Sequence, residues 1–319
     1  MDVVLVADGG GTKTDVAALG LDGAVLARSR VGAFVPQIIG PAKAARELDT
    51  AVRAVLAQID NPRVALGGLY FSGLDFPFEV DAFRAELDGN DWAGHLILDN
   101  DTFALLRAGT QEPTAVAVVC GTGMNCVGRG ADGRVVRFAS LGDVSGDWGG
   151  GGTLGMEAIW HAARAADRRG PATVLEPLVL KALGRACMDD VIIGFHTGQL
   201  EYDHVSRLAP LIFEAVAAGD AVALSVVERQ ADELVAFVTA TLTRLGVLGQ
   251  RCPVVLGGGV IAARHACLMD AIDARLRDRA PGAYPVIVTA PPILGAALLA
   301  FDHLGASPGV LARVRASLG

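Results

Sequence analysis

The sequence predicts an α/β protein in which one strand–turn–strand unit occurs twice. Short apolar runs of strand length alternate with segments of helical periodicity, which is the pattern of sheets covered by helices. Two of the predicted strands, residues 3–7 and 115–119, run directly into Gly-rich segments. An Asp-Gly dipeptide, typical of a hairpin turn, and a further strand follow both segments.

The two units align without a gap, at one constant offset of 110 residues. The matched pairs are Gly11-Thr12 with Gly121-Thr122, Gly20 with Gly130, and Asp22-Gly23 with Asp132-Gly133. Because the chain holds 40 glycines, two Gly-rich hairpins can coincide by chance. Three matches in one register nevertheless favour an internal duplication, and therefore two lobes of the same fold.

The remaining elements lie between and after these two units. We expect helices at residues 41–59, 80–87 and 227–245, the last ended by Gly246, and strands at 63–70, 95–98 and 253–256. A stretch with Gly and Pro, residues 108–113, predicts the boundary between lobes of residues 1–110 and 111–299. The C-terminal helix, about residues 300–319, is expected to pack back on the first lobe.

Composition and charge restrict the class of protein. The chain has 319 residues, 52% hydrophobic and 19% charged, which suits two ordered domains. The net charge of −8 argues against a nucleic-acid partner. Five dispersed cysteines without CxxC spacing favour a reducing compartment over a disulfide framework. With no signal peptide and no long apolar run, we expect a cytoplasmic protein without a membrane partner.

The first candidate site is the Gly-rich segment after the first strand. Glycine N–H groups can converge on phosphate oxygens because no Cβ stands in the way, and hydroxyls and a lysine add donors. Asp8, at the strand end, can hold a Mg²⁺ ion. A Gly-rich hairpin without a ligand is the alternative. The candidate phosphate-binding residues are Gly9, Gly10, Gly11, Thr12, Lys13 and Thr14.

Two further Gly-rich loops follow strands and favour a nucleotide site. The turn that contains Gly121 and Thr122 occupies the homologous position in the second unit, where it can face the first loop across a cleft. Together the two turns can hold a triphosphate from both sides. The third loop, Gly257-Gly258-Gly259, can lie flat against a nucleobase or ribose.

An acidic residue follows another predicted strand, in the segment Asn100-Asp101-Thr102. Asp101 can be merely a helix N-cap, which is the commoner role of such residues. Beside a phosphate cleft it can instead accept the proton of an attacking hydroxyl, with the helix N-terminus favouring its ionised form. The residues alone leave both roles open.

The segment LGDVSGDWGGGG, residues 141–152, is a candidate sugar site. Asp143 and Asp147 offer acceptors for hydroxyl groups, and the Trp148 indole offers a face on which a sugar ring can stack. The four consecutive glycines, residues 149–152, can equally form a flexible hinge.

Taken in order, five motifs resemble those of the BadF/BadG/BcrA/BcrD-type ATPase family, and most closely its N-acetylglucosamine kinase and glucosamine kinase branch. They are DGGGTKT from residue 8, Asn-Asp at 100, GTGMNC from 121, GDVSGDWGGGG from 142 and VVLGGGV from 254. The resemblance covers residues 3 to about 300. It implies the actin-like ATPase fold of the actin, sugar kinase and Hsp70 superfamily, with two ribonuclease-H-like lobes and an interlobe cleft.

The resemblance also implies roles for individual residues. Residues 8–14 and 120–123 become the phosphate loops, 256–260 the adenosine loop, and Asp101 the catalytic base. The implied substrate-binding positions are Asn100, Asp101, Met124, Asn125, Leu141, Gly142, Asp147 and Trp148. Val35, Met124 and Trp148 stand where the family usually has polar residues on the sugar side.

These roles imply an ATP-dependent kinase that uses Mg²⁺ and phosphorylates the 6-hydroxyl of an amino sugar, and a homodimer is common among relatives. The apolar replacements favour N-acetylglucosamine, since they suit the acetyl methyl and leave a buried ammonium without partners. Glucosamine and glucose are the alternatives, because Asp143 and Asp147 would welcome an ammonium if they face C2. A non-catalytic nucleotide or sugar sensor is the alternative of another class, against which the intact Asp8 and Asp101 argue.

Overall fold

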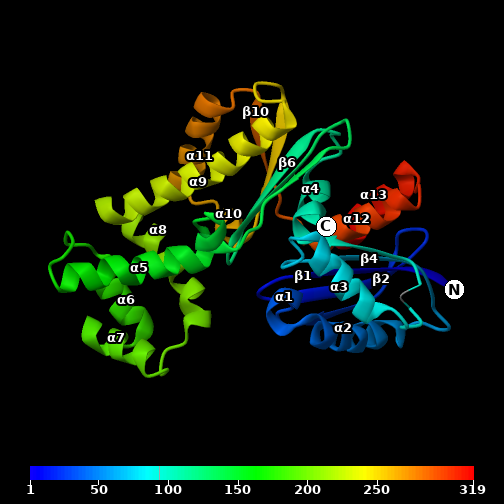
Figure 1. Ribbon diagram of the computed structural model, residues 1–319, viewed down its shortest axis with the longest axis horizontal. Helices are drawn as coiled ribbons and strands as arrows, with labels where there is room; N and C mark the ends of the chain where they lie inside the picture. The colour runs from blue at the N-terminus through cyan, green and yellow to red at the C-terminus, as the bar shows by residue number, and fades with distance from the viewer. Residues whose placement is uncertain (93) are drawn as a thin grey trace. The chain divides into compact units, whose positions relative to one another are not determined.

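Two five-stranded sheets with the same strand order form the framework of the chain. In the computed structural model, which describes residues 1–92 and 94–319 (Figure 1), the orders are β3-β2-β1-β4-β5 and β8-β7-β6-β9-β10. This repetition confirms the predicted α/β fold with an internal duplication. The strands are β1 (Asp2–Gly9), β2 (Thr14–Gly20), β3 (Val25–Val31), β4 (Arg63–Phe71), β5 (Leu96–Asn100), β6 (Ala115–Cys120), β7 (Met124–Arg129), β8 (Val135–Arg137), β9 (Cys252–Gly257) and β10 (Ala283–Ile287).

The same hairpin turn closes both copies, with hydrogen bonds at equivalent positions. Gly23 N–H donates to the Gly20 carbonyl at 2.9 Å, and Gly133 N–H donates to the Gly130 carbonyl at 3.0 Å. Gly23 and Gly133 have φ angles of +87° and +84°, which a residue without a Cβ adopts at little cost. Local turn chemistry therefore produces the repeat that the aligned dipeptides predict.

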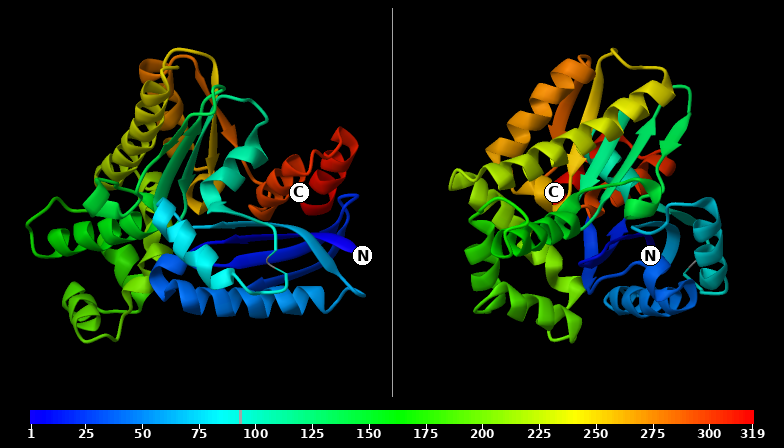
Figure 2. Two further views of the ribbon diagram at one scale, coloured as in Figure 1. Left: turned by 45° about the vertical axis from the view of Figure 1, so that its right-hand side comes forward. Right: turned by 60° about the vertical axis from the view of Figure 1, so that its left-hand side comes forward.

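Alternate residues of the first sheet enter two separate cores. Leu5 and Ala7 pack with α2 and α3, whereas Val4 and Val6 pack with α12 and α13, as expected when successive side chains of a strand point to opposite faces. Figures 1 and 2 show these helix pairs on opposite faces of the sheet. The helices are α1 (Pro36–Ile39), α2 (Pro41–Leu56), α3 (Pro77–Leu87), α4 (Asp101–Gly109), α12 (Ile293–His303) and α13 (Pro308–Leu318).

The chain divides into two compact units, and the last two helices belong with the first sheet. The first unit comprises residues 1–117, 127–139 and 286–319, and the second comprises 118–126 and 140–285. Asp302 on α12 accepts hydrogen bonds from Arg107 Nε and Nη2 of α4 at 2.5 and 3.0 Å. These bonds and the shared apolar core hold the C-terminal helices against residues near the start of the chain.

Helices dominate the second unit. The long helix α9 packs against α11 and α8, and α5 packs against α6 and α8. Among the described residues no single helix is both long and apolar enough to cross a membrane. One pair of helices joined at a bend, Tyr202–Ala217 and Ala221–Leu245, has the required length and apolar composition only when the two are taken together. The helices are η1 (Gly142–Ser145), α5 (Gly150–Ala166), α6 (Leu175–Leu183), α7 (Met188–His196), η2 (Tyr202–Leu208), α8 (Ala209–Ala217), α9 (Ala221–Leu245), α10 (Gly259–Ala262) and α11 (Ala266–Arg279).

Two element boundaries near the site differ from the prediction. The helix expected at 80–87 begins at Pro77, because proline suits a first helical turn and Glu79 accepts the N–H group of Phe76. The strand expected at 95–98 continues to Asn100, because its pairing with β4 extends to Phe71. The longer strand places Asn100 at the end of the first sheet, and the earlier helix start places Glu79 where it accepts the N–H groups of Asp75 and Phe76.

Candidate active site

The carboxyl ends of three parallel strands meet at one edge of the first sheet. β1 pairs with β4 and β4 with β5, so that Gly9, Phe71 and Asn100 occupy one row. Ligand sites of open α/β sheets lie outside such strand ends. Asp8, one residue before this row, and Asp101, one residue after it, therefore lie at the same edge although they are far apart in the sequence.

Asp8 is a buried carboxylate with an unused oxygen. The residue is 7% exposed, and no hydrogen-bond donor of the described residues reaches its Oδ1. Burial raises the pKa of Asp8 well above its ordinary value, as do the charges of Asp101 and Asp15, while Lys13 acts in the opposite direction. A buried polar atom without a partner is costly, and a cation at this position would remove that cost.

The Asp8 site suits Mg²⁺ better than a metal that needs a complete protein cage. Mg²⁺ usually keeps several waters and takes only one or two carboxylates plus substrate phosphates. In the described part of the chain, no group of three His, Cys, Asp or Glu residues converges as possible metal ligands.

The hairpin turn after Asp8 exposes polar groups on a fixed backbone. Gly10 N–H donates to the Lys13 carbonyl at 3.1 Å, and Ser72 N–H donates to the Gly9 carbonyl at 2.9 Å. Gly11, Thr12 and Lys13 are exposed, whereas Thr14 is buried and donates its hydroxyl to the Gly32 carbonyl at 3.0 Å. The turn thus exposes a hydroxyl and an ammonium, the latter 3.8 Å from the Asp15 carboxylate, while Thr14 fixes the turn itself.

The hydrogen bonds at the start of α4 show which residue caps this helix, a role that the sequence leaves open for Asp101 beside that of a base. Asn100 is the N-cap, since its Oδ1 accepts from Thr102 N–H at 3.0 Å and from Thr102 Oγ1 at 2.5 Å. Asp101 is the first helical residue and is not needed for the cap. Burial and the nearby charge of Asp75 raise the pKa of Asp101 to about 7, although the N–H groups of Thr102 and Asp101 lower it. A pKa near neutrality suits a general base.

Asp75 is a member of this cluster that the sequence analysis did not identify. It is 9% exposed, and its Oδ1 accepts a hydrogen bond from Asn100 Nδ2 at 2.9 Å, across 25 residues of sequence. Glu79 Oε2 accepts the Asp75 N–H at 2.9 Å and fixes the loop. The sequence contains one indication that Asp75 belongs to the site: it closely follows a buried strand, as Asp101 does.

In the second unit, the loop after β6 is packed between two other glycine segments. Gly151 and Gly152, at the start of α5, donate their N–H groups to the carbonyls of Gly121 and Thr122 at 2.7 and 2.8 Å. A Cβ on Gly150, whose φ is +83°, would lie 2.6 Å from the Gly123 carbonyl carbon. On the other side, a Cβ on Gly258 would overlap the Cys120 carbonyl. The glycine run 149–152 therefore forms the beginning of a closely packed helix.

The third Gly-rich loop lies at the end of β9. Gly257 ends this strand and Gly259 begins α10, with Gly258 between them at a φ of +93°. Nothing lies within 4 Å of a Cβ built on Gly259, so this part of the loop is open. An open backbone surface of this kind suits the predicted contact with a base or ribose.

The predicted sugar-side residues of loop 141–148 are mostly exposed. Leu141 and Gly142 lie at the turn η1, where the Ser145 hydroxyl accepts the Leu141 N–H at 2.7 Å and donates to the Asp147 carboxylate. The guanidinium of Arg229 lies 4.1 Å from the centre of the Trp148 ring. One face of this indole is therefore covered by a cation from α9.

The other predicted sugar-side residues are more enclosed. Met124 is 7% exposed, and its Sδ accepts a hydrogen bond from Gln230 Nε2 at 3.0 Å. Asn125 Oδ1 accepts from Cys126 N–H at 2.7 Å. In the first unit, Val35 lies against Gly73, in the same loop as Asp75. The first unit thus brings Val35, Asp8, Asn100 and Asp101 to one region, and the other substrate positions belong to the second unit.

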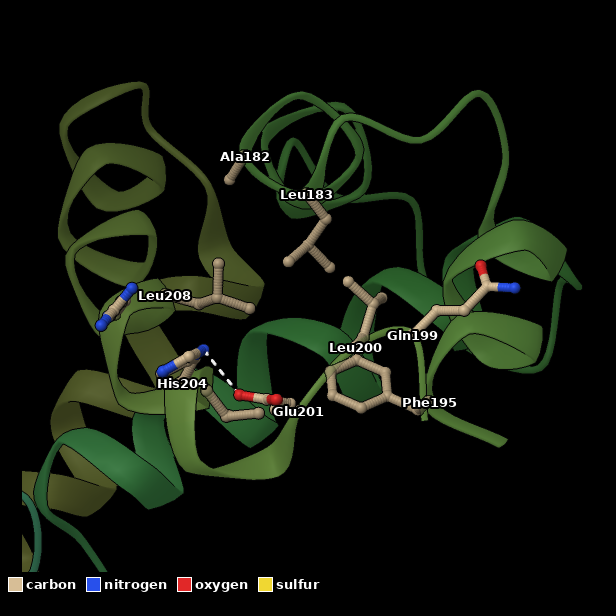
Figure 3. A pocket seen from close by; sticks show the side chains of 10 residues that line it. Ala182, Leu183, Phe195, Gln199, Leu200, Glu201, His204 and Leu208 are labelled. Carbon is tan, nitrogen blue, oxygen red and sulfur yellow. Dashed lines mark ion pairs between the residues drawn. The ribbon is translucent and has the colours of Figure 1, made fainter. Parts of the chain in front are cut away.

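The helical part of the second unit has surface pockets of its own. Figure 3 shows one of about 350 Å³, in which Phe195, Leu183 and Leu200 form apolar walls and Glu201 pairs with His204 at 3.4 Å. None of the predicted site residues lines this pocket. Trp148 lines a different pocket of about 300 Å³, together with Trp160 and Arg229.

The duplicated sheet order, with a Gly-rich turn after the first strand of each copy, defines an actin-like ATPase fold, the class that includes sugar kinases. A solved structure of a ROK family glucokinase from Streptomyces griseus, in complex with glucose and AMPPNP, has the same fold. It aligns with a TM-score of 0.57 over 94% of this chain and 99% of that one, at 17% identity.

The chain belongs to the BadF/BadG/BcrA/BcrD ATPase family, whose model matches residues 7–300. It is 27% identical to an N-acetyl-D-glucosamine kinase of Dictyostelium discoideum, over 94% of this chain and 98% of the relative. It is 26% identical to an N-acetylmuramic acid/N-acetylglucosamine kinase of Clostridium acetobutylicum, over 82% and 86%. A structure from Chromobacterium violaceum, provisionally named an N-acetylglucosamine kinase, aligns with a TM-score of 0.74 at 25% identity, over 93% and 98%.

Proposed function

We propose that this protein is an ATP-dependent amino-sugar kinase that phosphorylates the 6-hydroxyl of N-acetylglucosamine. The observation that carries the proposal is the pair of carboxylates at one sheet edge. Asp8 has a buried oxygen without a donor, and Asp101 has a pKa of about 7. Membership of an ATPase family and similarity to kinases named for N-acetylglucosamine support the nucleotide and the sugar class.

In this mechanism Asp101 is the general base. Its carboxylate accepts the proton of the 6-hydroxyl while that oxygen forms a bond to the γ-phosphorus and the bond to the leaving ADP oxygen breaks. The proton remains on Asp101 until it passes to water. Asn100 holds the start of α4, and Asp75 fixes the Asn100 amide through its hydrogen bond, so the base keeps its position.

The nucleotide would be held by the Gly-rich loops. The turn of residues 9–14 and the loop at Gly121 and Thr122 would take the phosphates, and the loop 257–259 would take the nucleoside. Asp8 would hold Mg²⁺, which when bound neutralises charge on the phosphates during transfer. The proposal also includes a homodimer, measurable by light scattering, and a cytoplasmic location, which its five free cysteines suit.

A panel of sugars tests the substrate. With saturating Mg·ATP, we expect kcat/KM for N-acetylglucosamine to exceed that for glucosamine by about tenfold or more, with glucose weaker still. Val35 offers an apolar contact that an acetyl methyl can use and an ammonium cannot. The measurement is a coupled ADP-release assay that also includes N-acetylmuramic acid.

The same assay separates the alternatives. A preference for glucosamine would show that Asp143 and Asp147 face C2 and that the proposed substrate is wrong. Nucleotide and sugar binding without turnover of any sugar in the panel would indicate a sensor, and would refute the kinase proposal.

The substitution Asp75→Asn is expected to move the pH dependence of the reaction. An asparagine oxygen can still accept from Asn100 Nδ2, but the negative charge that raises the pKa of Asp101 is lost. In the pH profile of kcat/KM, the fall in activity on the acid side should therefore shift to lower pH. The kcat at pH 8 should stay within about twofold of wild type. An unchanged acid limb, with activity intact, would show that Asp75 does not act on the base.

A further inference from the structure

Gln230 is a fully buried amide on α9 that joins three separate segments. It is 0% exposed, between the buried apolar side chains of Val227 and Leu234 on the same helix. Its Oε1 accepts the N–H of Gly150 at 2.9 Å, and its Nε2 donates to Met124 Sδ at 3.0 Å. Burying an amide is costly unless both of its ends find partners, and here one end holds the start of α5 and the other the start of β7.

The start of α5 determines which way the loop after β6 presents its backbone. The carbonyls of Gly121 and Thr122 both point at α5, since they accept from Gly151 and Gly152. In a trans peptide the carbonyl of one residue and the N–H of the next point in opposite directions. The N–H groups of Thr122 and Gly123 therefore point away from α5.

These two N–H groups lie on an accessible part of the loop. Thr122 and Gly123 are exposed, and a Cβ built on Gly123 would have nothing within 4 Å. Successive N–H groups that point the same way form a concavity suited to an anion. The direction of this concavity depends on the helix turn that Gln230 holds through Gly150.

We propose that Gln230 is a positioning residue for the nucleotide phosphates, acting through Gly150 and the first turn of α5 on the loop of residues 121–123. It touches no substrate itself. The inference rests on the proposed function in that it takes ATP to be the ligand of this loop. It adds a residue from α9, a helix that the Gly-rich motifs do not include.

The test compares nucleotide binding in matched variants of the full chain. Gln230→Met keeps the side-chain volume but removes the acceptor for Gly150, and Gln230→Asn withdraws the amide by one methylene. Thr241→Val is the control, since Thr241 is also 0% exposed on α9 but bonds Cys126 Sγ and the Phe237 carbonyl. Binding is measured by calorimetry with Mg·AMPPNP, and KM is measured for ATP and for N-acetylglucosamine.

We expect Gln230→Met and Gln230→Asn to raise Kd for Mg·AMPPNP and KM for ATP by about 5- to 30-fold, because the Gly150 N–H loses its amide acceptor and is left with the weaker acceptor Cys120 Sγ. KM for the sugar should change less than KM for ATP, because the bond lost at Met124, a predicted sugar-side position, is to the weak acceptor Sδ. General destabilisation would not produce such a difference. Thr241→Val should lower Tm without changing nucleotide affinity. If Gln230→Met does not fold, the nucleotide affinity of Gln230→Asn alone tests the proposal.

Two results would overturn the inference. One is a folded Gln230 variant that binds Mg·AMPPNP as tightly as wild type. The other is an equal loss of nucleotide affinity in Thr241→Val. A wild-type protein that binds the nucleotide but phosphorylates no sugar would instead refute the proposed function. The comparison of nucleotide affinity between the variants and wild type would still test the role of Gln230.

Discussion

Replacing Asp101 with asparagine is expected to lower kcat for N-acetylglucosamine by about 10²–10⁴-fold, while the Kd for the sugar changes far less. Asparagine has nearly the same shape but cannot accept the hydroxyl proton at neutral pH. The helix cap should survive, because Asn100, whose Oδ1 accepts from Thr102 N–H, is unchanged in this variant. The measurement is steady-state kinetics together with sugar calorimetry, with Asp81→Asn as a control at an exposed carboxylate of the same unit.

Thermal stability gives this prediction an independent check. The pKa of Asp101 in the folded protein, about 7, exceeds its ordinary value of 3.8, so ionisation is disfavoured on folding. The contribution of Asp101 to wild-type stability should therefore fall as pH rises from about 4 to 7, and Asp101→Asn should equal or exceed the wild-type Tm at pH 8. Asn100→Ala should instead lower Tm, because the loss of an N-cap lowers the free energy of unfolding by roughly 0.5–2 kcal/mol. Near-normal turnover in Asp101→Asn would exclude the base assignment.

The substitution Asp8→Asn is expected to lower kcat/KM for Mg·ATP by about 10²–10³-fold, since a metal that neutralises phosphate charge contributes several kcal/mol. Asparagine keeps the size of the side chain but removes the anionic oxygen that would hold Mg²⁺. Calorimetry without nucleotide should still detect sugar binding, and the Mg²⁺ concentration needed for half-maximal activity should rise.

A variant in the same strand provides the control. Asp2→Asn makes the same chemical change at the beginning of β1, where the carboxylate pairs with Arg63 at the surface. It should leave the Mg²⁺ dependence unchanged. If Asp8→Asn abolished sugar binding and left Mg·AMPPNP affinity normal, Asp8 would act on the sugar and the metal assignment would be wrong.

The sequence by itself predicted the repeated hairpins and the Gly-rich loops because these depend on neighbouring residues. An Asp-Gly dipeptide with positive φ at the glycine closes each hairpin, whatever surrounds it. Continuous apolar runs such as residues 3–7 likewise predicted strands that are buried on both faces. The positions of Asp8 and Asp101 at strand ends followed from the same local patterns. Their proposed roles remain predictions.

Only the tertiary structure determined which residues of different helices, strands and loops contact one another. Asp75 meets Asn100 across 25 residues, and Gln230 meets Gly150 across 80, and no spacing in the sequence indicates either contact. The pKa of Asp101 depends on burial and on a charge from another strand's loop, both of which exist only after the strands pair. Local conformational preference selects elements, whereas burial and electrostatics depend on distances in space. For this reason the sequence predicted candidate site residues but not the residues that support them.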